Sequence, residues 1–306
     1  MKTHKLLFLS MLALLCLTTS CEKDDSATSA DDKLKESLIG GWYNEEHSEY
    51  DEFFKSGTFY YELAGNFTGD GTYDVKDGVL TLSTTMYGEA ITTSNYLTIS
   101  GSKMVWEDVE SGDVYEYIKV IDDVHMNIGE SISLSSITQG LEVEKISISN
   151  SPIIVDENAD KITAYIDGSG FMKISTNDGD VAVRFTVENE NNVLYPDMSN
   201  FIGKSQDELT SIIGIPYYLK EEYSYYKYNS SLISSAMFSI NSDGYTYSIN
   251  ITFNSEVDTD KILAYLNENY EILIDGSESG TYIYTTDKAQ YIAFIPSLGS
   301  MQFMSL

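Results

Sequence analysis

Short strand-like stretches separated by glycine-containing turns follow one another from Ser37 onward, and they constrain the fold of this 306-residue chain most. They recur about every 8 to 12 residues, and apolar residues show no helical spacing before residue 200. The clearest case is the dipeptide Asp77-Gly78, which joins two alternating runs and is a preferred turn for a tight β-hairpin. The pattern predicts a mainly-β protein with helices confined to its C-terminal third.

The chain is strongly acidic, with 48 Asp and Glu residues against 18 Lys and Arg residues and a net charge of −30. Phosphate backbones repel such a surface, so nucleic acid is excluded as a partner. Apolar residues nevertheless make up 42% of the chain and aromatic residues 12%, which is enough to build a hydrophobic core. We therefore expect a folded protein with an acidic surface rather than a disordered one.

Residues 37–123 form the first expected unit, a small β-barrel. The patterns Gly40-x-Trp42, Phe53-x-x-x-Gly57-Thr58-Phe59 and Gly71-Thr72-Tyr73-x-Val75-x-Asp77-Gly78-x-Leu80-Thr81-Leu82 occur in this order. Together they resemble the lipocalin-like domains of bacterial surface lipoproteins, and the resemblance implies a barrel whose interior is either filled or holds a small apolar ligand. Trp42 and Trp106 are more often core residues than a ligand platform.

Residues 124–194 form the second expected unit, a short β-sandwich. In the run Val181–Val187 the odd-numbered residues are large and apolar, so one face of that strand should lie in a core. An opening Gly-x-Ser strand and this closing strand resemble a bacterial Ig-like domain, and such domains usually act as spacers. Arg184, the only arginine in the chain, is expected to pair with nearby acids rather than to form an anion site.

Residues 195–306 form the third expected unit, an α+β domain with two helices on an antiparallel sheet. Ser205 and Glu208 match a capping box at the start of a helix that Gly214 and Pro216 should end. A second helix is predicted over Asp258–Tyr270, where apolar residues have helical spacing.

The N-terminal residues have the features of an export and anchoring signal. Residues 1–20 combine lysines with a short apolar run, which is typical of a signal peptide and too short for a membrane span. Leu17–Cys21 resembles the lipobox of bacterial lipoproteins, which implies that Cys21 is acylated and that residues 21–36 form an acidic tether. The residues after the cysteine resemble an export signal to the outer face of the outer membrane, and they are Glu22, Lys23, Asp24 and Asp25. The alternatives are a secreted protein with a free cysteine and an ordinary solvated linker.

No cofactor or metal site is expected, and we expect no enzyme. The spacing of Asn66, Thr68, Asp70, Gly71 and Asp77 matches part of an EF-hand loop, but alternating strands surround it instead of helices. The chain contains no phosphate-binding loop and no dinucleotide fingerprint. Because the chain has 48 acidic residues, no pair of carboxylates stands out in the sequence as catalytic.

Tyrosines are concentrated between residues 217 and 228, where six occur within twelve positions. In a strand, Tyr223 and Tyr225 share one face while Tyr226 and Tyr228 share the other. These four residues are the candidate ligand-binding set, because tyrosine stacks on sugars or apolar groups and hydrogen-bonds without adding charge. The alternative is that they only fill a core, since tyrosine is a good strand former.

Two functions are compatible with these features. The chain could be a lipid-anchored binding or adhesion module that faces the cell exterior and contacts a glycan, a peptide or a host protein. Alternatively, it could be an accessory or assembly component of an outer-membrane complex.

Overall fold

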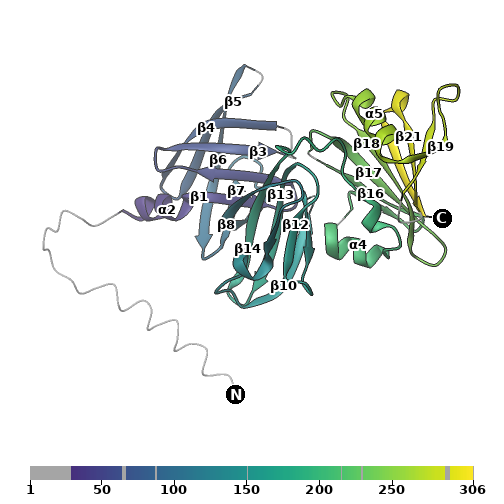
Figure 1. Ribbon diagram of the computed structural model, residues 1–306. Helices are drawn as coiled ribbons and strands as arrows, with labels where there is room; N and C mark the ends of the chain where they lie inside the picture. The colour runs from purple at the N-terminus through teal and green to yellow at the C-terminus, as the bar shows by residue number, and fades with distance from the viewer. Residues whose placement is uncertain are drawn as a thin grey trace, which may run out of the picture.

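The computed structural model describes residues 29–63, 67–86, 88–149, 151–214, 216–228, 230–286 and 290–305. The expected mainly-β fold is confirmed: a barrel, a pair of packed sheets and a large antiparallel sheet follow one another along the chain (Figure 1). In this part of the chain no helix has the length and apolar character needed to cross a membrane. Cys21 and the export residues Glu22, Lys23, Asp24 and Asp25 lie outside the described residues.

The first eight strands form a closed antiparallel barrel, because β8 pairs with both β7 and β1. The strands are β1 (Gly40–Asn44), β2 (Glu49–Phe53), β3 (Thr58–Leu63), β4 (Phe67–Lys76), β5 (Val79–Met86), β6 (Glu89–Ser100), β7 (Lys103–Asp108) and β8 (Val114–Asn127). Asp77-Gly78 joins β4 to β5 as predicted, and both residues have positive φ angles, as this turn requires. Trp42 and Trp106 are buried in the hydrophobic cluster inside the barrel.

Helix α2 (Ala30–Leu38) covers one end of the barrel (Figure 1). Leu34 packs against the barrel cluster, and the Asp31 carboxylate accepts the two N–H groups of the β4–β5 turn at 2.9 and 3.1 Å. In the described part of the expected tether, residues 29–36, the chain therefore forms most of this helix. Although this segment is rich in charged residues, it forms a helix that is stabilised by specific contacts with the barrel.

The second unit shares a strand with the barrel, since the later part of β8 pairs in parallel with β14. Its elements are β9 (Ser131–Ser133), α3 (Leu134–Ile137), β10 (Val143–Ser149), β11 (Ile153–Asp156), β12 (Lys161–Ala164), β13 (Gly168–Thr176) and β14 (Gly179–Glu188). The sheet β8-β14-β13-β10 packs on the small sheet β11-β12-β9, and one hydrophobic cluster lies between them. The expected boundary at residue 123 falls inside β8.

Both faces of β14 are covered. Its odd-numbered apolar residues, from Val181 to Val187, are buried between the two sheets as predicted. The opposite face packs on the outer wall of the barrel, where Arg184 Nη2 lies 2.8 Å from Glu62 Oε2 and the guanidinium lies over the Tyr50 ring at 4.7 Å. Arg184 therefore pairs with acids, as expected, but it does so inside an interface rather than in open solvent.

The third unit is an eight-stranded antiparallel sheet with helices. In sheet order the strands are β15 (Tyr218–Lys220), β16 (Tyr223–Lys227), β17 (Ile233–Ile240), β18 (Thr246–Phe253), β22 (Ser300–Ser305), β21 (Gln290–Ile295), β20 (Tyr282–Thr285) and β19 (Glu271–Ile274). The helical segments are η1 (Ser199–Phe201), α4 (Gln206–Ile213), α5 (Thr259–Asn269) and η2 (Pro296–Leu298). The capping box of Ser205 and Glu208 is present at the start of α4, as predicted.

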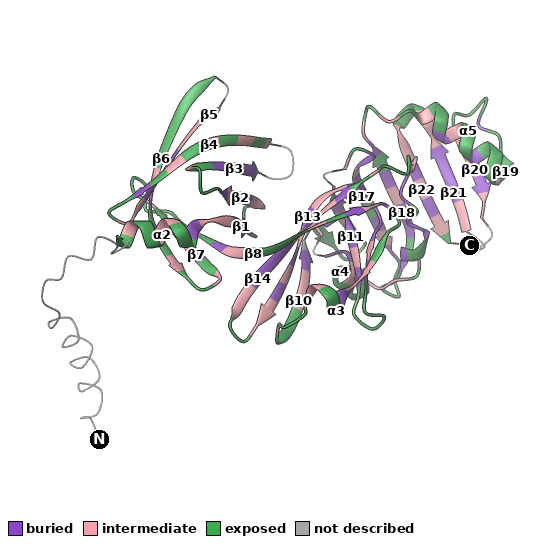
Figure 2. Cartoon of the chain, turned by 60° about the vertical axis from the view of Figure 1, so that its left-hand side comes forward, coloured by how far each residue is buried: buried purple, intermediate pink, exposed green. Residues whose placement is uncertain are grey.

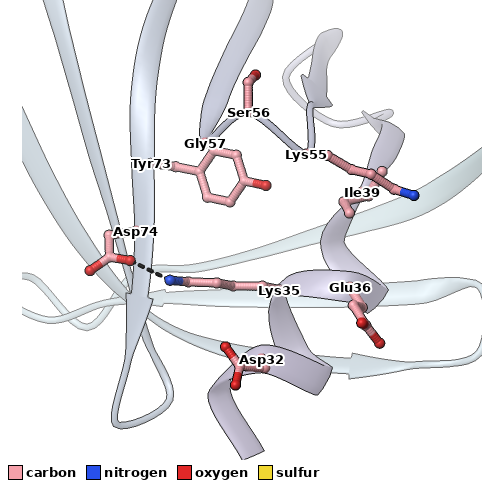
Figure 3. Close-up of a pocket in the computed structure, with 9 residues that line it drawn as sticks. All are labelled: Asp32, Lys35, Glu36, Ile39, Lys55, Ser56, Gly57, Tyr73 and Asp74. Atoms are coloured by element: carbon pink, nitrogen blue, oxygen red, sulfur yellow. Dashed lines mark hydrogen bonds and ion pairs between the residues drawn. The ribbon is translucent and has the colours of Figure 1, made fainter. Parts of the chain in front are cut away.

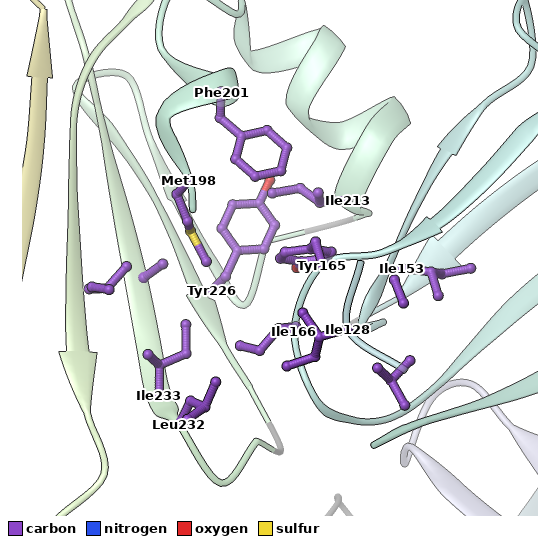
Figure 4. Packing of buried hydrophobic residues seen from close by; sticks show 14 of the residues in the cluster. Ile128, Ile153, Tyr165, Ile166, Met198, Phe201, Ile213, Tyr226, Leu232 and Ile233 are labelled. Carbon is purple, nitrogen blue, oxygen red and sulfur yellow. The ribbon is translucent and has the colours of Figure 1, made fainter. Parts of the chain in front are cut away.

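The second and third units share one hydrophobic core. Helix α4 contacts β10 and β11 of the second unit, and its residue Ile213 lies in the same buried cluster as Tyr165 and Tyr226 (Figure 4). The Asp167 carboxylate also accepts the backbone N–H of Ser231 at 2.8 Å. The expected boundary at residue 195 therefore lies within a continuous core.

Candidate ligand-binding surface

One face of the C-terminal sheet is covered by the helices and by the second unit. The cross-strand register places a set of large apolar side chains on this face, and all of them are buried: Tyr226, Ala236, Phe238, Ile249, Ile251, Met301, Phe303, Ile292, Phe294 and Tyr284. Ile262 and Leu266 of α5 belong to the same cluster. Along β22 the residues of this face alternate with more exposed ones, as Figure 2 shows.

The opposite face, which we call the open face, has a different chemistry. Two cross-strand rows define it: Tyr218, Tyr225, Met237, Asn250, Gln302, Ala293 and Ile283, and beside them Lys220, Tyr223, Ser239, Ser248, Met304, Tyr291 and Thr285. From β15 to β20 neither row contains a carboxylate, although the chain has 48 acids. None of these residues belongs to the core cluster. The open face therefore presents aromatic, amide, hydroxyl and thioether groups, together with the ammonium group of Lys220.

Four tyrosines gather at the β15 end of the open face, and we call Tyr217, Tyr218, Tyr223 and Tyr225 the tyrosine patch. The rings of Tyr218 and Tyr223 are 6.0 Å apart, and those of Tyr217 and Tyr225 are 6.3 Å apart. Two lysines cap these pairs by cation–π contacts, which hold a cation over an aromatic face. Lys227 Nζ lies 3.9 Å from the Tyr217 ring centre, and Lys220 Nζ lies 5.7 and 5.6 Å from the other pair.

The structure separates the four tyrosines of the predicted set. Tyr223 and Tyr225 are half-buried on the open face, which leaves part of each ring accessible to a ligand. Tyr226 is 1% exposed on the covered face, and its hydroxyl donates to the Gly214 carbonyl at 3.3 Å. Tyr228 is half-buried beside the Tyr165 ring at the junction with the second unit. Burial raises the pKa values of Tyr226 and Tyr228, so both stay neutral. Neither of these two residues can share a ligand with the open face.

Sequence reasoning omitted Tyr217 and Tyr218 from the predicted set because they precede the alternating run. The signal lay in Glu221-Glu222, a tight polar turn that folds β15 back onto β16 and sets Tyr218 opposite Tyr225. Tyr217 and Tyr218 are the most exposed of the group, at 61% and 46%. A β-hairpin predicted for this stretch would have placed all four residues of the tyrosine patch together.

A pocket of ≈ 960 Å³ opens beside α2 at the end of the barrel (Figure 3). Lys35 lies in its wall and is paired with Asp74 at 2.5 Å, while the Tyr73 hydroxyl donates to the Phe54 carbonyl at 2.8 Å. The Lys35–Asp74 pair joins α2 to β4, whereas the Tyr73–Phe54 hydrogen bond lies within the barrel. Docking of the helix therefore accounts for the ion pair in this pocket.

The EF-hand-like residues do not form a loop in the structure. Thr68, Asp70 and Gly71 lie on strand β4, and Asp77 lies in the following turn, while Asn66 is outside the described residues. The described part of the chain contains no group of three or more His, Cys, Asp and Glu side chains that could hold a metal ion.

No protein-family model matches the chain, and no curated protein matches it either.

Proposed function

We propose that this protein is a non-catalytic binding module, displayed outside the cell on a lipid anchor at Cys21, and that its ligand contacts the tyrosine patch and the adjoining open face. The observation that carries this proposal is that the two rows of the open face contain no carboxylate from β15 to β20, before Glu271 on β19, in a chain of net charge −30. A merely solvated sheet face would share the acidic character of the rest of the surface. An aromatic face without carboxylates can instead lose its water to a partner without burying an unpaired negative charge.

The chemistry of the patch fits a glycan or an exposed protein segment. Tyrosine rings stack on sugar rings or on apolar side chains, and their hydroxyls hydrogen-bond to either class of ligand. The side chains of Asn250 and Gln302, farther along the same row, add amide donors and acceptors. Lys220 and Lys227 favour a ligand that is neutral or acidic.

The order of the units supports display. The barrel resembles lipocalin-like domains and follows the anchor, and the second unit, which resembles an Ig-like spacer, comes next. The tyrosine patch belongs to the third unit, which lies at the far end of the molecule from the barrel (Figure 1). This arrangement would hold the patch away from a membrane that carries the lipid anchor.

The test of the patch is binding of the full chain to arrays of glycans and of extracellular proteins. Replacing Tyr223 and Tyr225 by Ala should weaken binding by about 1 kcal/mol or more, the size of an interface hot spot. The melting temperature should not change, because both rings lie outside the core. Tyr96→Ala is the matched control, since Tyr96 is 54% exposed on the barrel. Equal losses for both variants would contradict the proposal, and a stoichiometric membrane partner after mild detergent extraction would favour the assembly role instead.

The anchor is tested separately. Cys21→Ala should leave an unlipidated precursor or a released protein, which metabolic labelling with a fatty acid detects. After replacement of Lys23, Asp24 and Asp25 by Ala, the protein should still be lipidated. Protease added to whole cells should no longer digest it. Full digestion of this triple variant would show that the acidic run is only a linker.

A further inference from the structure

Strand β2 directs two carboxylates into the barrel near the end opposite α2. Glu49 and Asp51 are two residues apart, so they share the inner face, and Asp51 is 1% exposed. The Tyr117 hydroxyl, from β8 on the opposite side of β1, donates to Glu49 Oε2 at 3.0 Å. Acids are rarely buried in a barrel interior unless a positive group accompanies them.

Three polar atoms in the barrel interior are buried and have no hydrogen-bond partner among the described residues. They are Asp51 Oδ2, Asn44 Nδ2 and Trp106 Nε1. Asn44 lies directly across the β1–β2 ladder from Glu49, and its Oδ1 accepts the His47 N–H at 2.9 Å, which fixes the amide nitrogen as the free end. The Trp106 donor is linked to the pair through Tyr117, whose ring contacts Trp106 and whose hydroxyl donates to Glu49. A buried donor or acceptor without a partner costs folding free energy, so these free groups indicate a site for a polar ligand.

The charged groups facing the pair leave its negative charge largely uncompensated. Among the described residues, neither carboxylate forms an ion pair with a lysine or arginine. The exposed ring of His47 interacts electrostatically with Glu49, and the Tyr117 hydroxyl hydrogen-bonds to the pair. Burial raises the pKa of Glu49, and burial together with the neighbouring Glu49 raises the pKa of Asp51 well above its ordinary value. A cation in the site would compete with the proton that burial favours on the pair.

Aromatic rings form the wall beside the carboxylates. The Trp106 ring lies 4.5 Å from the Tyr117 ring and 6.3 Å from the Phe53 ring, between centres. Aromatic faces attract organic cations, most strongly where water is excluded. Glu49 itself is only half-buried, so its carboxylate can be reached from the end of the barrel near His47.

We propose that this end of the barrel binds a small amino alcohol, whose ammonium group donates to Asp51 and Glu49 while its hydroxyl accepts from Asn44 and Trp106. The ammonium charge balances the carboxylates and lies against the aromatic wall. The hydroxyl oxygen satisfies the two free donors. This site is separate from the tyrosine patch, and its ligand is independent of the proposed surface function.

The two tryptophans of the chain provide a direct readout. The full chain is labelled with ¹⁵N at the indole nitrogens, and ethanolamine is added at neutral pH. The Trp106 N–H resonance, assigned by Trp106→Phe, should shift and saturate. The Trp42 N–H donates to the Leu38 carbonyl at 2.7 Å and should not move. Ethylene glycol, which lacks the amine, should give no saturable shift, and ethylamine, which lacks the hydroxyl, should bind more weakly than ethanolamine. No saturable shift with ethanolamine, or an equal one with ethylene glycol, overturns the proposal.

Variants test the carboxylates. Asp51→Asn should weaken ethanolamine binding at least tenfold, whereas Glu107→Gln, on the outer wall next to Trp106, should leave it unchanged. If Asp51→Asn does not fold, Glu49→Gln is measured instead, with the same tenfold loss expected. Affinity should also rise from about pH 5 to about pH 8, because protons compete with the cation for the pair. Undiminished binding in the folded variant, or affinity independent of pH, overturns the proposal.

Discussion

Arg184 joins the barrel to the second unit, and replacing it by Met should destabilise the barrel strongly. The side chain of Arg184 is 16% exposed and that of Glu62 is 9% exposed, so both charges are largely out of water. Ser169 Oγ donates to the other oxygen of Glu62 at 2.9 Å, but this contact supplies no positive charge. Arg184→Met therefore leaves a buried carboxylate without a counter-ion.

The magnitude follows from this burial. Removing one partner of a buried ion pair costs about 3 kcal/mol or more, because the remaining charge is uncompensated. The second acid near Arg184, Asp123, is 38% exposed and can be solvated, so it adds little. Replacing both partners, as in Arg184→Met with Glu62→Gln, removes the buried charge altogether. The double variant should lie within about 1 kcal/mol of the natural protein.

Urea unfolding followed by tryptophan fluorescence measures this effect, since Trp42 and Trp106 both report on the barrel. Lys103→Met is the control, because it breaks a barrel ion pair with Glu116 whose side chains are 52% and 63% exposed. An exposed pair of this kind contributes less than about 1 kcal/mol. A loss below 1 kcal/mol for Arg184→Met, or an equal loss in the double variant, would refute the reasoning.

Two further predictions concern the shared core and the buried acids. Limited proteolysis should give no stable fragment that ends near residue 195, because one hydrophobic cluster spans the second and third units; separate fragments on a denaturing gel would contradict this. The raised pKa of Asp51 means that the folded state retains a proton which the unfolded chain releases near 3.8. This contribution to stability is complete below that pH and is lost as the pH rises through the native pKa of Asp51. The melting temperature of Asp51→Asn, relative to that of the natural protein, should therefore increase as the pH rises. Parallel pH profiles of the two proteins would disprove the raised pKa of Asp51.

Local patterns in the sequence predicted many of the elements correctly. The Asp77-Gly78 hairpin, the buried face of the strand Val181–Val187 and the capping box of Ser205 each depend on residues close together in the chain. Strand alternation and helix capping are set by backbone geometry, so they can be read without knowing the tertiary contacts. For the same reason the two-faced character of β16 was predictable, although the partner of each face was not.

The tertiary structure decided which residues meet across long distances in the chain. Helix α2 forms on the barrel because Asp31 reaches a turn 46 residues away, and its own sequence gives little apolar signal. The pairing of β8 with β14 joins two units that the sequence treats as separate, and nothing local to either strand specifies a parallel partner. Only the closed barrel singles out Glu49 and Asp51 among 48 acids. Burial depends on all the surrounding strands at once, whereas sequence periodicity reports only the face on which a residue lies.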